Sequence, residues 1–432
     1  MRSNDRSLRK SLDLYFHVSE RSSTFRTEVA AGVSTFLSLS YIFVIHPFIL
    51  ARIGLEEHTT LVLTVVVSTA ATLACGLWVR LPFVFAPGLE MSLYIALVVV
   101  PLLKLTTEEA FSLVIVSGAL LCCLGNRHVR HYVIDSVPHH FATAVAVTMA
   151  AFLLAIALSF IGVVDYQTGH WTIAGLTNAG WAATGCVVII LCELVGFRPS
   201  VLVGIMVVAV LAHSRGALAN SHATSFIPDL SVVLSNASVR APFSTIHLSL
   251  QAAQALFILF VLSSYGSLSK LIKLSKGTTI VHRGDIPGVN RMFVLDGLAA
   301  IASGTTGNSN VTTFVESGVG ISVGGRTGLT SVTTGILMVC ALGLLPFIDL
   351  VSTAAIVGAL VYVGVQFVPD NDALMDMWIG EKITVLIMVL MVLKFLAIGI
   401  AFDFGLFAFC LMSWIKPFLA SPHLPGANSS NI

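Results

Sequence analysis

Charged side chains are scarce in this sequence. Only 10% of the 432 residues are Asp, Glu, Lys or Arg, whereas 56% are hydrophobic and the mean hydropathy is +0.93. A soluble domain of this length does not carry so apolar a surface, so that class is excluded. The formal net charge is only +1, and no basic face predicts binding to nucleic acid.

Cysteine is also scarce and shows no pattern. The seven cysteines lie in or beside apolar runs without the spacing of a metal site. They indicate small buried hydrophobic residues, so we expect no disulfide framework, no metal centre and no cofactor. The sequence has no HExxH, no GxxxxGK[ST] loop and no GxSxG with catalytic partners. We therefore expect no enzyme and no ATP hydrolysis.

Long apolar runs fill most of the chain. A bilayer-crossing helix needs roughly 17 to 25 such residues, and the runs predict an all-α polytopic membrane protein with about fourteen transmembrane spans. The expected spans of the first half are 28–50, 59–79, 83–102, 107–125, 140–163, 177–197 and 199–214. Those of the second half are 250–269, 289–304, 309–323, 328–347, 351–368, 382–400 and 402–419.

A polar segment divides the chain. The predicted divisions are a leader (1–27), a first seven-span repeat (28–214), a linker (215–249), a second seven-span repeat (250–420) and a tail (421–432). The leader lacks the apolar core of a removable signal peptide. Lys and Arg gather in the leader and in alternate loops, as they do on the cytoplasmic side. We expect a multi-pass protein of the cell membrane with both termini in the cytoplasm.

One span in each half is interrupted at the corresponding third position. Residues 81–100 contain Pro87 and Gly88, and residues 305–320 contain several polar side chains and the carboxylate of Glu316. Irregular polar backbone survives at membrane depth only where it lines a cavity or is buried in protein. Paired broken spans predict an inverted-repeat transporter with its site at the midplane. The alternative is a pair of Pro or Gly kinks in ordinary helices.

Several runs carry a family resemblance. They are TFLSLSYIFVIHPFIL (35–50), LPFVFAPG (81–88), VIDSVP (133–138), PSVLVGI (199–205), VTTFVESGVG (311–320) and GGRTGLT (324–330). In their order and spacing these runs resemble the nucleobase transporter superfamily, closest to the AzgA-like adenine/guanine/hypoxanthine permeases. The resemblance implies a seven-plus-seven inverted repeat, with a core domain of spans 1–4 and 8–11 and a gate domain of the rest. It also implies proton-coupled uptake of a purine base by elevator-like movement, and a possible homodimer in the bilayer.

The sequence departs from this family at the expected site. The usual Asp of the eighth span is replaced by Ser263 in the run SSYGSL, where Tyr265 and Ser267 follow. In the third span the run PGLEMS places Glu90 where a glycine is usual. In the first span His46 stands where an Asn is usual. These departures place the coupling acid in question.

Glu316 is the first candidate for binding the base. On a predicted helix it shares a face with Thr312 and Thr313. A carboxylate at membrane depth is a functional-site hypothesis by default, and the resemblance implies that it binds base N–H groups. The alternative is a capping box from Thr313 to Glu316.

Two residues join Glu316 as candidates for proton coupling. We hypothesise that Glu90 supplies the acidity missing at Ser263; the alternative is a Glu that reaches an open vestibule. His46 is of the type that titrates near neutral pH and shuttles protons, and its alternative role is ring packing against a neighbouring span.

The remaining candidates surround these acids. Asn308, Ser309 and Asn310 offer donors and acceptors that suit a heterocycle, and their alternative role is loop capping. Phe85 is a candidate for stacking on a planar ring or for simple packing. The predicted substrate-binding set is Glu316, Glu90, Ser263, Ser267, Asn308, Ser309, Asn310, Thr312, Thr313, Phe85 and Tyr265.

Other functions remain open at this point. The missing acid at Ser263 is compatible with a transporter of another small polar solute, coupled or uncoupled. It is equally compatible with a sensor or scaffold that kept the fold without transport, because a fold alone does not fix function. Asp296 and Arg326 are expected to be structural, as a buried pair or a loop lock.

Overall fold

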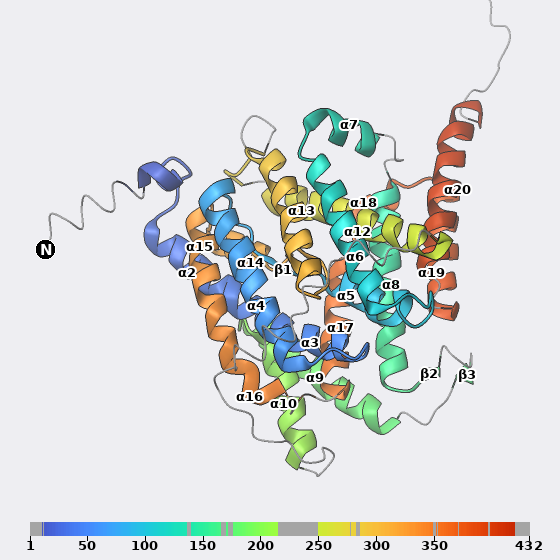
Figure 1. The fold of residues 1–432 in the computed structure, drawn as a ribbon, viewed down its shortest axis with the longest axis horizontal. Coiled ribbons are helices and arrows are strands. Elements are labelled where there is room, and N and C mark those ends of the chain that lie inside the picture. Colours follow the sequence, from blue (N-terminus) through green and yellow to red (C-terminus); the bar gives the residue numbers. More distant parts are fainter. Residues whose placement is uncertain are drawn as a thin grey trace, which may run out of the picture.

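The computed structural model describes residues 11–419, with gaps at 12, 136–139, 166–169, 172–175, 215–248, 277, 282–285, 349–350, 352, 370 and 396–397. The tail at 421–432, nearly all of the predicted linker at 215–249 and the first ten residues of the leader lie outside the described residues. The described part is almost entirely helical (Figure 1).

The helices follow the predicted spans closely. Those of the first half are α2 (Phe25–Leu39), α3 (Ile42–Ala51), α4 (Glu57–Ala74), α5 (Leu89–Tyr94), α6 (Thr107–Cys123), α7 (Arg127–Asp135), α8 (Phe141–Phe160), α9 (Leu176–Leu194) and α10 (Ser200–Ser214). Those of the second half are α12 (Leu250–Ser275), α13 (Val289–Thr305), α14 (Ser317–Val323), α15 (Gly328–Met338), α16 (Leu345–Ile348), α17 (Thr353–Phe367), α18 (Asn371–Met375), α19 (Ile379–Phe395) and α20 (Ile398–Leu419).

Short elements complete the chain. The short π-helices η1 (Cys75–Val79) and η2 (Ile95–Val99) continue α4 and α5, and the 3-10 helix η3 (Val339–Leu344) continues α15. The strands are β1 (Phe85–Pro87), β2 (Val164–Asp165), β3 (His170–Trp171) and β4 (Val311–Thr313). The β2–β3 hairpin and α7 were not among the predicted elements. The chain bends by 111° between α6 and α7.

Several helices have the length and composition of membrane spans. Within the described residues, five are long and apolar enough to cross a bilayer: Phe25–Ala51, Glu57–Val79, Thr143–Phe160, Leu250–Ser275 and Gly328–Phe347. Their starts carry the expected signals. The Ser249 hydroxyl accepts from the backbone N–H of Ala252 at the start of α12, and such caps satisfy N–H groups that have no partner inside the helix.

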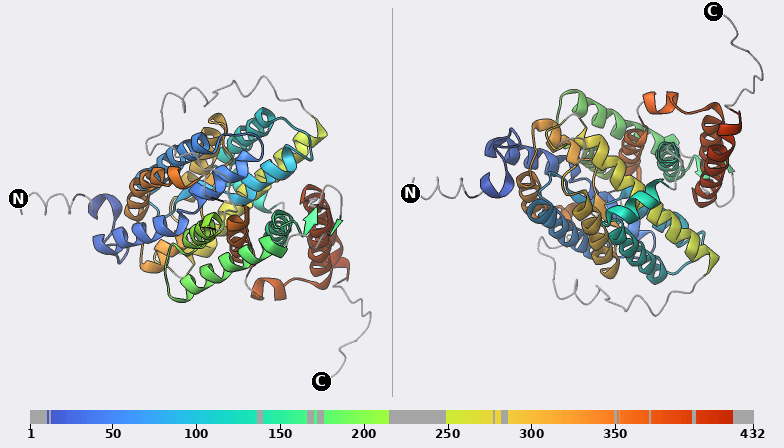
Figure 2. Two further views of the ribbon diagram at one scale, coloured as in Figure 1. Left: turned by 90° about the horizontal axis from the view of Figure 1, so that it is seen from below. Right: turned by 90° about the horizontal axis from the view of Figure 1, so that it is seen from above.

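The helices pack in two groups. The first contains α2, α3, α4, α5, α6, α12, α13, α14 and α15, and the second contains α8, α9, α10, α17, α19 and α20. Contacts between the groups are fewer and run mainly from α12 to α8 and α20, and from α2 to α10. In Figure 1, α2 and α15 lie on the left and α20 on the right, and the two views of Figure 2 keep this separation.

A small antiparallel sheet lies within the first group. Phe85 of β1 pairs with Thr313 of β4, and Pro87 pairs with Val311. All residues of both strands are buried. The pairing corrects the expected spans at 83–102 and 309–323, which begin with extended backbone instead of helix, so that α5 starts at Leu89 and α14 only at Ser317.

Side-chain hydroxyls from neighbouring helices fix β1. Thr72 of α4 accepts from the N–H of Phe85 at 3.0 Å. Ser331 of α15 lies 2.7 Å from the carbonyl oxygen of Leu81 and 2.8 Å from that of Phe83. Buried backbone groups are costly unless they are hydrogen-bonded. These hydroxyls therefore explain how a non-helical segment is tolerated in the interior.

Helices α6 and α13 approach each other closely through glycine. A Cβ atom on Gly118 would lie 2.7 Å from the carbonyl oxygen of Gly297. A Cβ atom on Gly297 would lie 2.4 Å from Sγ of Cys122 and 2.5 Å from the carbonyl oxygen of Gly118. Small residues of this kind let helix backbones meet in membrane proteins.

We expect Gly297→Ala to lower stability by about 1 to 3 kcal/mol, because the new methyl group forces α6 and α13 apart. The measurement is the thermal unfolding of purified protein in detergent. Gly266→Ala is the matched control, since nothing lies within 4 Å of a Cβ at that helical position, and it should leave the Tm unchanged or raise it slightly. Equal Tm values for the two variants would contradict the close packing.

Candidate functional site

One face of α12 is hydrogen-bonded to the segment that contains β4. Asn310 donates through Nδ2 to Oγ of Ser263 at 2.6 Å. One turn further, the hydroxyls of Ser267 and Thr312 are 2.9 Å apart. Residues spaced by four share a helix face, so the two serines meet alternate positions of the extended segment. Ser263, which stands where the family has an acid, is therefore hydrogen-bonded to the side-chain amide of Asn310.

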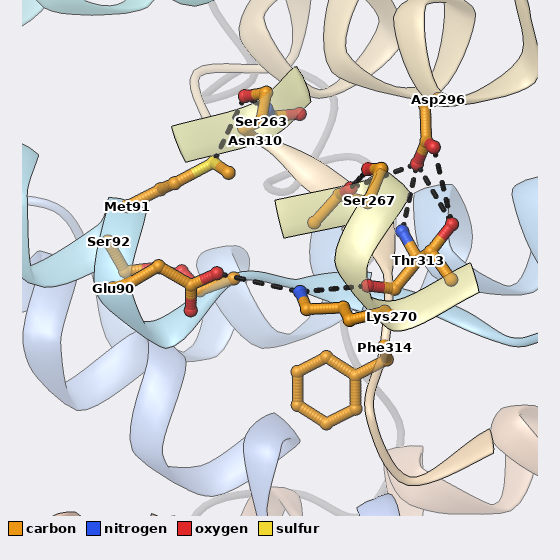
Figure 3. Close-up of polar contacts among 12 residues, drawn as sticks. Glu90, Met91, Ser92, Ser263, Ser267, Lys270, Asp296, Asn310, Thr313 and Phe314 are labelled. Carbon is orange, nitrogen blue, oxygen red and sulfur yellow. Dashed lines mark hydrogen bonds and ion pairs between the residues drawn. The ribbon is translucent and has the colours of Figure 1, made fainter. Parts of the chain in front are cut away.

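Lys270 lies on the same face of α12, one turn beyond Ser267, and places its ammonium group in the site. Its Nζ donates to the carbonyl oxygen of Thr313 at 3.0 Å and lies 3.6 Å from Oε1 of Glu90. The side chains are 11% and 5% exposed, and Figure 3 shows the ammonium between the two partners. Buried Glu90 thus does not reach an open vestibule, which contradicts that interpretation.

Asp296 of α13 holds β4 from the other side. Its Oδ1 accepts from the N–H of Thr313 and from the hydroxyl of Thr312, each at 2.9 Å. Arg326 donates instead to the carbonyl oxygens of Ile321 and Gly325. The expected structural roles of Asp296 and Arg326 hold, but each serves a different backbone segment and they do not form a pair.

His46 lies in a buried chain of hydrogen bonds that joins the two interrupted stretches. Its Nε2 lies 2.5 Å from Oδ1 of Asn308, and its Nδ1 lies 2.9 Å from Oγ of Ser92. Asn308 donates through Nδ2 to Thr64 at 2.9 Å, and Ser92 meets the hydroxyl of Ser309 at 2.7 Å. A neutral imidazole with its proton on Nε2 fits these partners. Both ring nitrogens are engaged within the protein.

Glu316 stands at the start of α14. Tyr41 donates its hydroxyl proton to Oε1 of Glu316 at 2.5 Å. Oε2 is buried, and among the described residues it has no hydrogen-bond partner. The capping-box interpretation was wrong, because Thr313 lies in β4, where its hydroxyl contacts Asp296, and Glu316 makes no side-chain cap. Oε2 of Glu316 is therefore a buried acceptor that has no donor among the described residues.

A cavity of about 280 Å³ adjoins Glu316. Tyr41 and Glu316 line it from the first helix group. The second group contributes Arg198, Tyr362 and Gln366, together with other residues near the junction of α9 and α10. This volume of about 280 Å³ lies just below the usual range of ligand pockets, roughly 300 to 1,000 Å³. The cavity suits a small ligand held between the two groups.

The predicted residues divide into distinct sets. Glu316 is the only predicted residue that lines the described cavity. Behind it lie residues that are hydrogen-bonded to one another or to their neighbours: Ser263, Ser267, Asn308, Ser309, Asn310, Thr312 and Thr313. Within this set Asn310 keeps Oδ1 buried without a partner in the described chain.

Two aromatic candidates lie elsewhere. Phe85 packs in a buried apolar cluster with Met292 and Ile321. Tyr265 lies on the face of α12 away from Ser263 and meets the ring of Phe141 edge-on, with ring centroids 6.3 Å apart. Both residues therefore pack within the protein, as the alternative for Phe85 proposed.

Neither Tyr41 nor the role of Lys270 is predicted from the sequence. The expected span 250–269 ends just before Lys270, yet α12 extends to Ser275 and includes it. Its spacing from Ser263 and Ser267 is the signal that would have found it, because the three share one helix face. Tyr41 carried no local signal. Among the described residues no cluster of His, Cys, Asp or Glu has the form of a metal site.

Comparison with known proteins identifies relatives over most of the chain. Residues 26–369 match a family model described as a permease family. The chain is 26% identical over 412 residues to adenine permease AdeP of Escherichia coli K12, covering 93% of this chain and 90% of that protein. It is 26% identical over 362 residues to guanine/hypoxanthine permease PbuO of Bacillus subtilis 168, covering 81% and 82%.

A solved structure shares the fold. The transmembrane domain of a cyanobacterium bicarbonate transporter, BicA, superimposes with a TM-score of 0.63 at 17% identity, covering 87% of this chain and 97% of that one. At this identity the likeness concerns the fold alone. The match to the permease family and the long apolar helices show that this chain is a multi-pass membrane protein.

We expect Tyr41→Phe to cost about 1.5 to 3 kcal/mol of folding free energy, since it removes the donor to a buried carboxyl group. Thermal unfolding of the purified variant measures the loss. Tyr94→Phe is the control, because the buried Tyr94 hydroxyl has no partner among the described residues, and its loss should be neutral or stabilising. If both variants lose the same stability, the Tyr41 hydrogen bond contributes nothing specific.

Proposed function

This chain belongs to the permease family whose model matches residues 26–369, and from that membership we propose that it is a secondary active transporter of purine nucleobases or a related small heterocycle. Permeases move solutes without transforming them, so the chain is a transporter and not an enzyme. The substrate class is taken from the relatives named as adenine and guanine/hypoxanthine permeases.

Glu316 is the observation that carries the proposal. Tyr41 holds one oxygen of its carboxyl group, and the other oxygen is a buried acceptor without a partner in the described chain. A purine base presents N–H donors along its edge, and a carboxylate accepts such donors at both oxygens. A bound base would satisfy the acceptor, whose unpaired state costs about 1 to 3 kcal/mol.

The opposite wall of the cavity complements a heterocycle. Arg198 and Gln366 offer N–H donors to ring nitrogens or exocyclic oxygens, and Tyr362 adds an aromatic side chain with a hydroxyl. The second helix group also contributes the carboxyl group of Glu193, so the cavity offers acceptors on both groups and the donors of Arg198 and Gln366 on the second. A ligand bound there would contact both groups at once.

The transport cycle we propose uses these groups as core and gate. The first helix group corresponds to spans 1–4 and 8–11 of a fourteen-span, seven-plus-seven inverted repeat, with β1–α5 and β4–α14 as its interrupted third and tenth spans. The second group corresponds to the gate. The few contacts between the groups and the cavity between them support elevator-like movement of the core. Both termini are proposed to face the cytoplasm of a cell, and dimerisation would involve the gate.

Protons are the proposed coupling ion, and Glu316 is their proposed carrier. His46 has both ring nitrogens engaged, and Glu90 is paired with Lys270. Of the three candidates, Glu316 alone combines a free oxygen with a cavity wall. Proton and base would then compete or cooperate at one carboxyl group.

The test is uptake of labelled adenine, guanine, hypoxanthine and uracil by transport-deficient cells that express the protein, with and without a protonophore. We expect accumulation of at least one purine and its collapse with the protonophore. Glu316→Gln should reduce uptake by about 10- to 100-fold, the equivalent of one charged hydrogen bond of 1.5 to 3 kcal/mol.

Glu20→Gln is the control, because the Glu20 side chain is 77% exposed near the N-terminal end, and its uptake should match that of the unmodified protein. The proposal fails if well-expressed protein accumulates none of the four bases. Uptake that survives the protonophore would remove proton coupling and leave facilitated diffusion. Binding without accumulation would point to the sensor alternative.

A further inference from the structure

The ammonium group of Lys270 occupies a site made of oxygen atoms. It contacts Oε1 of Glu90 at 3.6 Å and the carbonyl oxygen of Thr313 at 3.0 Å. These partners come from two different elements, α5 and β4, and Figure 3 shows Lys270 reaching between them from α12. The transport steps above assign no chemistry to this cation.

The two contacts are of the kind that hold hard monovalent cations. Carboxylate and backbone carbonyl oxygens are the usual ligands of such ions, and in transporters they are often supplied by non-helical backbone at an interrupted span. The carbonyl group of Thr313 belongs to the extended segment of β4. Its oxygen is therefore free of an intrahelical partner and can face a cation.

We propose that the ammonium group of Lys270 is a tethered cation, which permanently fills a binding site for Na⁺ or a small primary ammonium ion between β4 and α5. The proposal rests on the proposed function only for its transport readout. Removing the side chain beyond Cβ would expose the oxygen atoms of Glu90 and Thr313 to a cation from solution.

Glu90 is a buried carboxylate whose partner is a cation. The ammonium group of Lys270 lies 3.6 Å from its Oε1, and a buried charge is costly unless it is paired. A fixed lysine provides that cation without an ion from solution. Transport should accordingly be independent of Na⁺ in the unmodified protein.

The groups that position Glu90 and Thr313 do not include the side chain of Lys270. Gly88 leaves room for the carboxyl group of Glu90, since a Cβ at position 88 would lie 3.1 Å from Oε1. On the same helix face as Lys270, Ser267 contacts Thr312 of β4 and Ser263 accepts from Asn310 just before it. These bonds do not involve the lysine, so the oxygen atoms are expected to stay in place when its side chain is shortened.

The test measures thermal unfolding of purified Lys270→Ala in NaCl, KCl, methylammonium chloride and choline chloride at equal ionic strength. In choline, which is too large for the site, we expect the variant to unfold several degrees below the unmodified protein. Na⁺ or methylammonium should raise its Tm saturably, because a ligand that binds only the folded state stabilises it by mass action. The unmodified protein should show the same Tm in all four salts.

Two variants serve as controls. The double variant Glu90→Gln/Lys270→Ala lacks the carboxylate and should show no cation-dependent rise in Tm. Lys273→Ala removes an exposed lysine one turn along α12 and should behave as the unmodified protein in every salt. A rise of equal size in choline, or an equal rise in the double variant, would overturn the proposal.

A failure of Lys270→Ala to fold is also decisive. Lys270→Ala could fail to fold in every one of the four salts while the double variant folds. In that case Glu90 and Lys270 form a simple ion pair and no cation site exists. Uptake of a labelled base in Na⁺ and in choline is then compared across the same variants. If cations raise the Tm of Lys270→Ala but no protein takes up a base, the transport function is rejected and the cation site is retained. If the unmodified protein takes up a base but no cation raises the Tm of Lys270→Ala, the cation site is rejected and the transport function is retained.

Discussion

A polypeptide at membrane depth must satisfy every backbone N–H and C=O group inside the protein. The arrangement of β1 and β4 follows from this constraint, because neither segment is helical and each completes the other's hydrogen bonds. Some backbone groups here are not satisfied by the strand pairing. They are hydrogen-bonded by hydroxyl groups of α4 and α15 and by the carboxyl group of Asp296. The site is therefore built on backbone that cannot shift without losing several bonds together.

This rigidity separates the polar side chains by role. The serines of α12 and the asparagines before β4 are hydrogen-bonded within the protein and hold the segment that contains β4 against α12 and α4. Glu90 is paired with Lys270 beside this segment. Glu316 differs from these because it stands where the packed interior meets a cavity. At that boundary Tyr41 holds one oxygen of the carboxyl group, and the second oxygen is the one proposed to meet a ligand.

Much of this organisation could be predicted from composition and spacing. The polar residues at 305–320 and the Pro-Gly pair at 87–88 indicate irregular backbone in otherwise apolar chain, and the helices begin and end near the predicted boundaries. The partners could not be predicted in the same way. Tyr41 and Glu316 are 275 positions apart, and no local periodicity links them. The sequence predicts helix at Thr313, whereas the structure has a strand there, because three residues are too few to show an alternating pattern.

Helix α12 joins the two helix groups with contacts of different kinds. Its site face meets β4 through hydrogen bonds, which depend on direction. Its opposite face presents Tyr265 to Phe141, whose ring in turn lies 6.0 Å from that of Phe409. Burial of apolar rings depends less on direction than hydrogen bonding does. The attachment of α12 to β4 is therefore more specific in geometry than its attachment to α8 and α20.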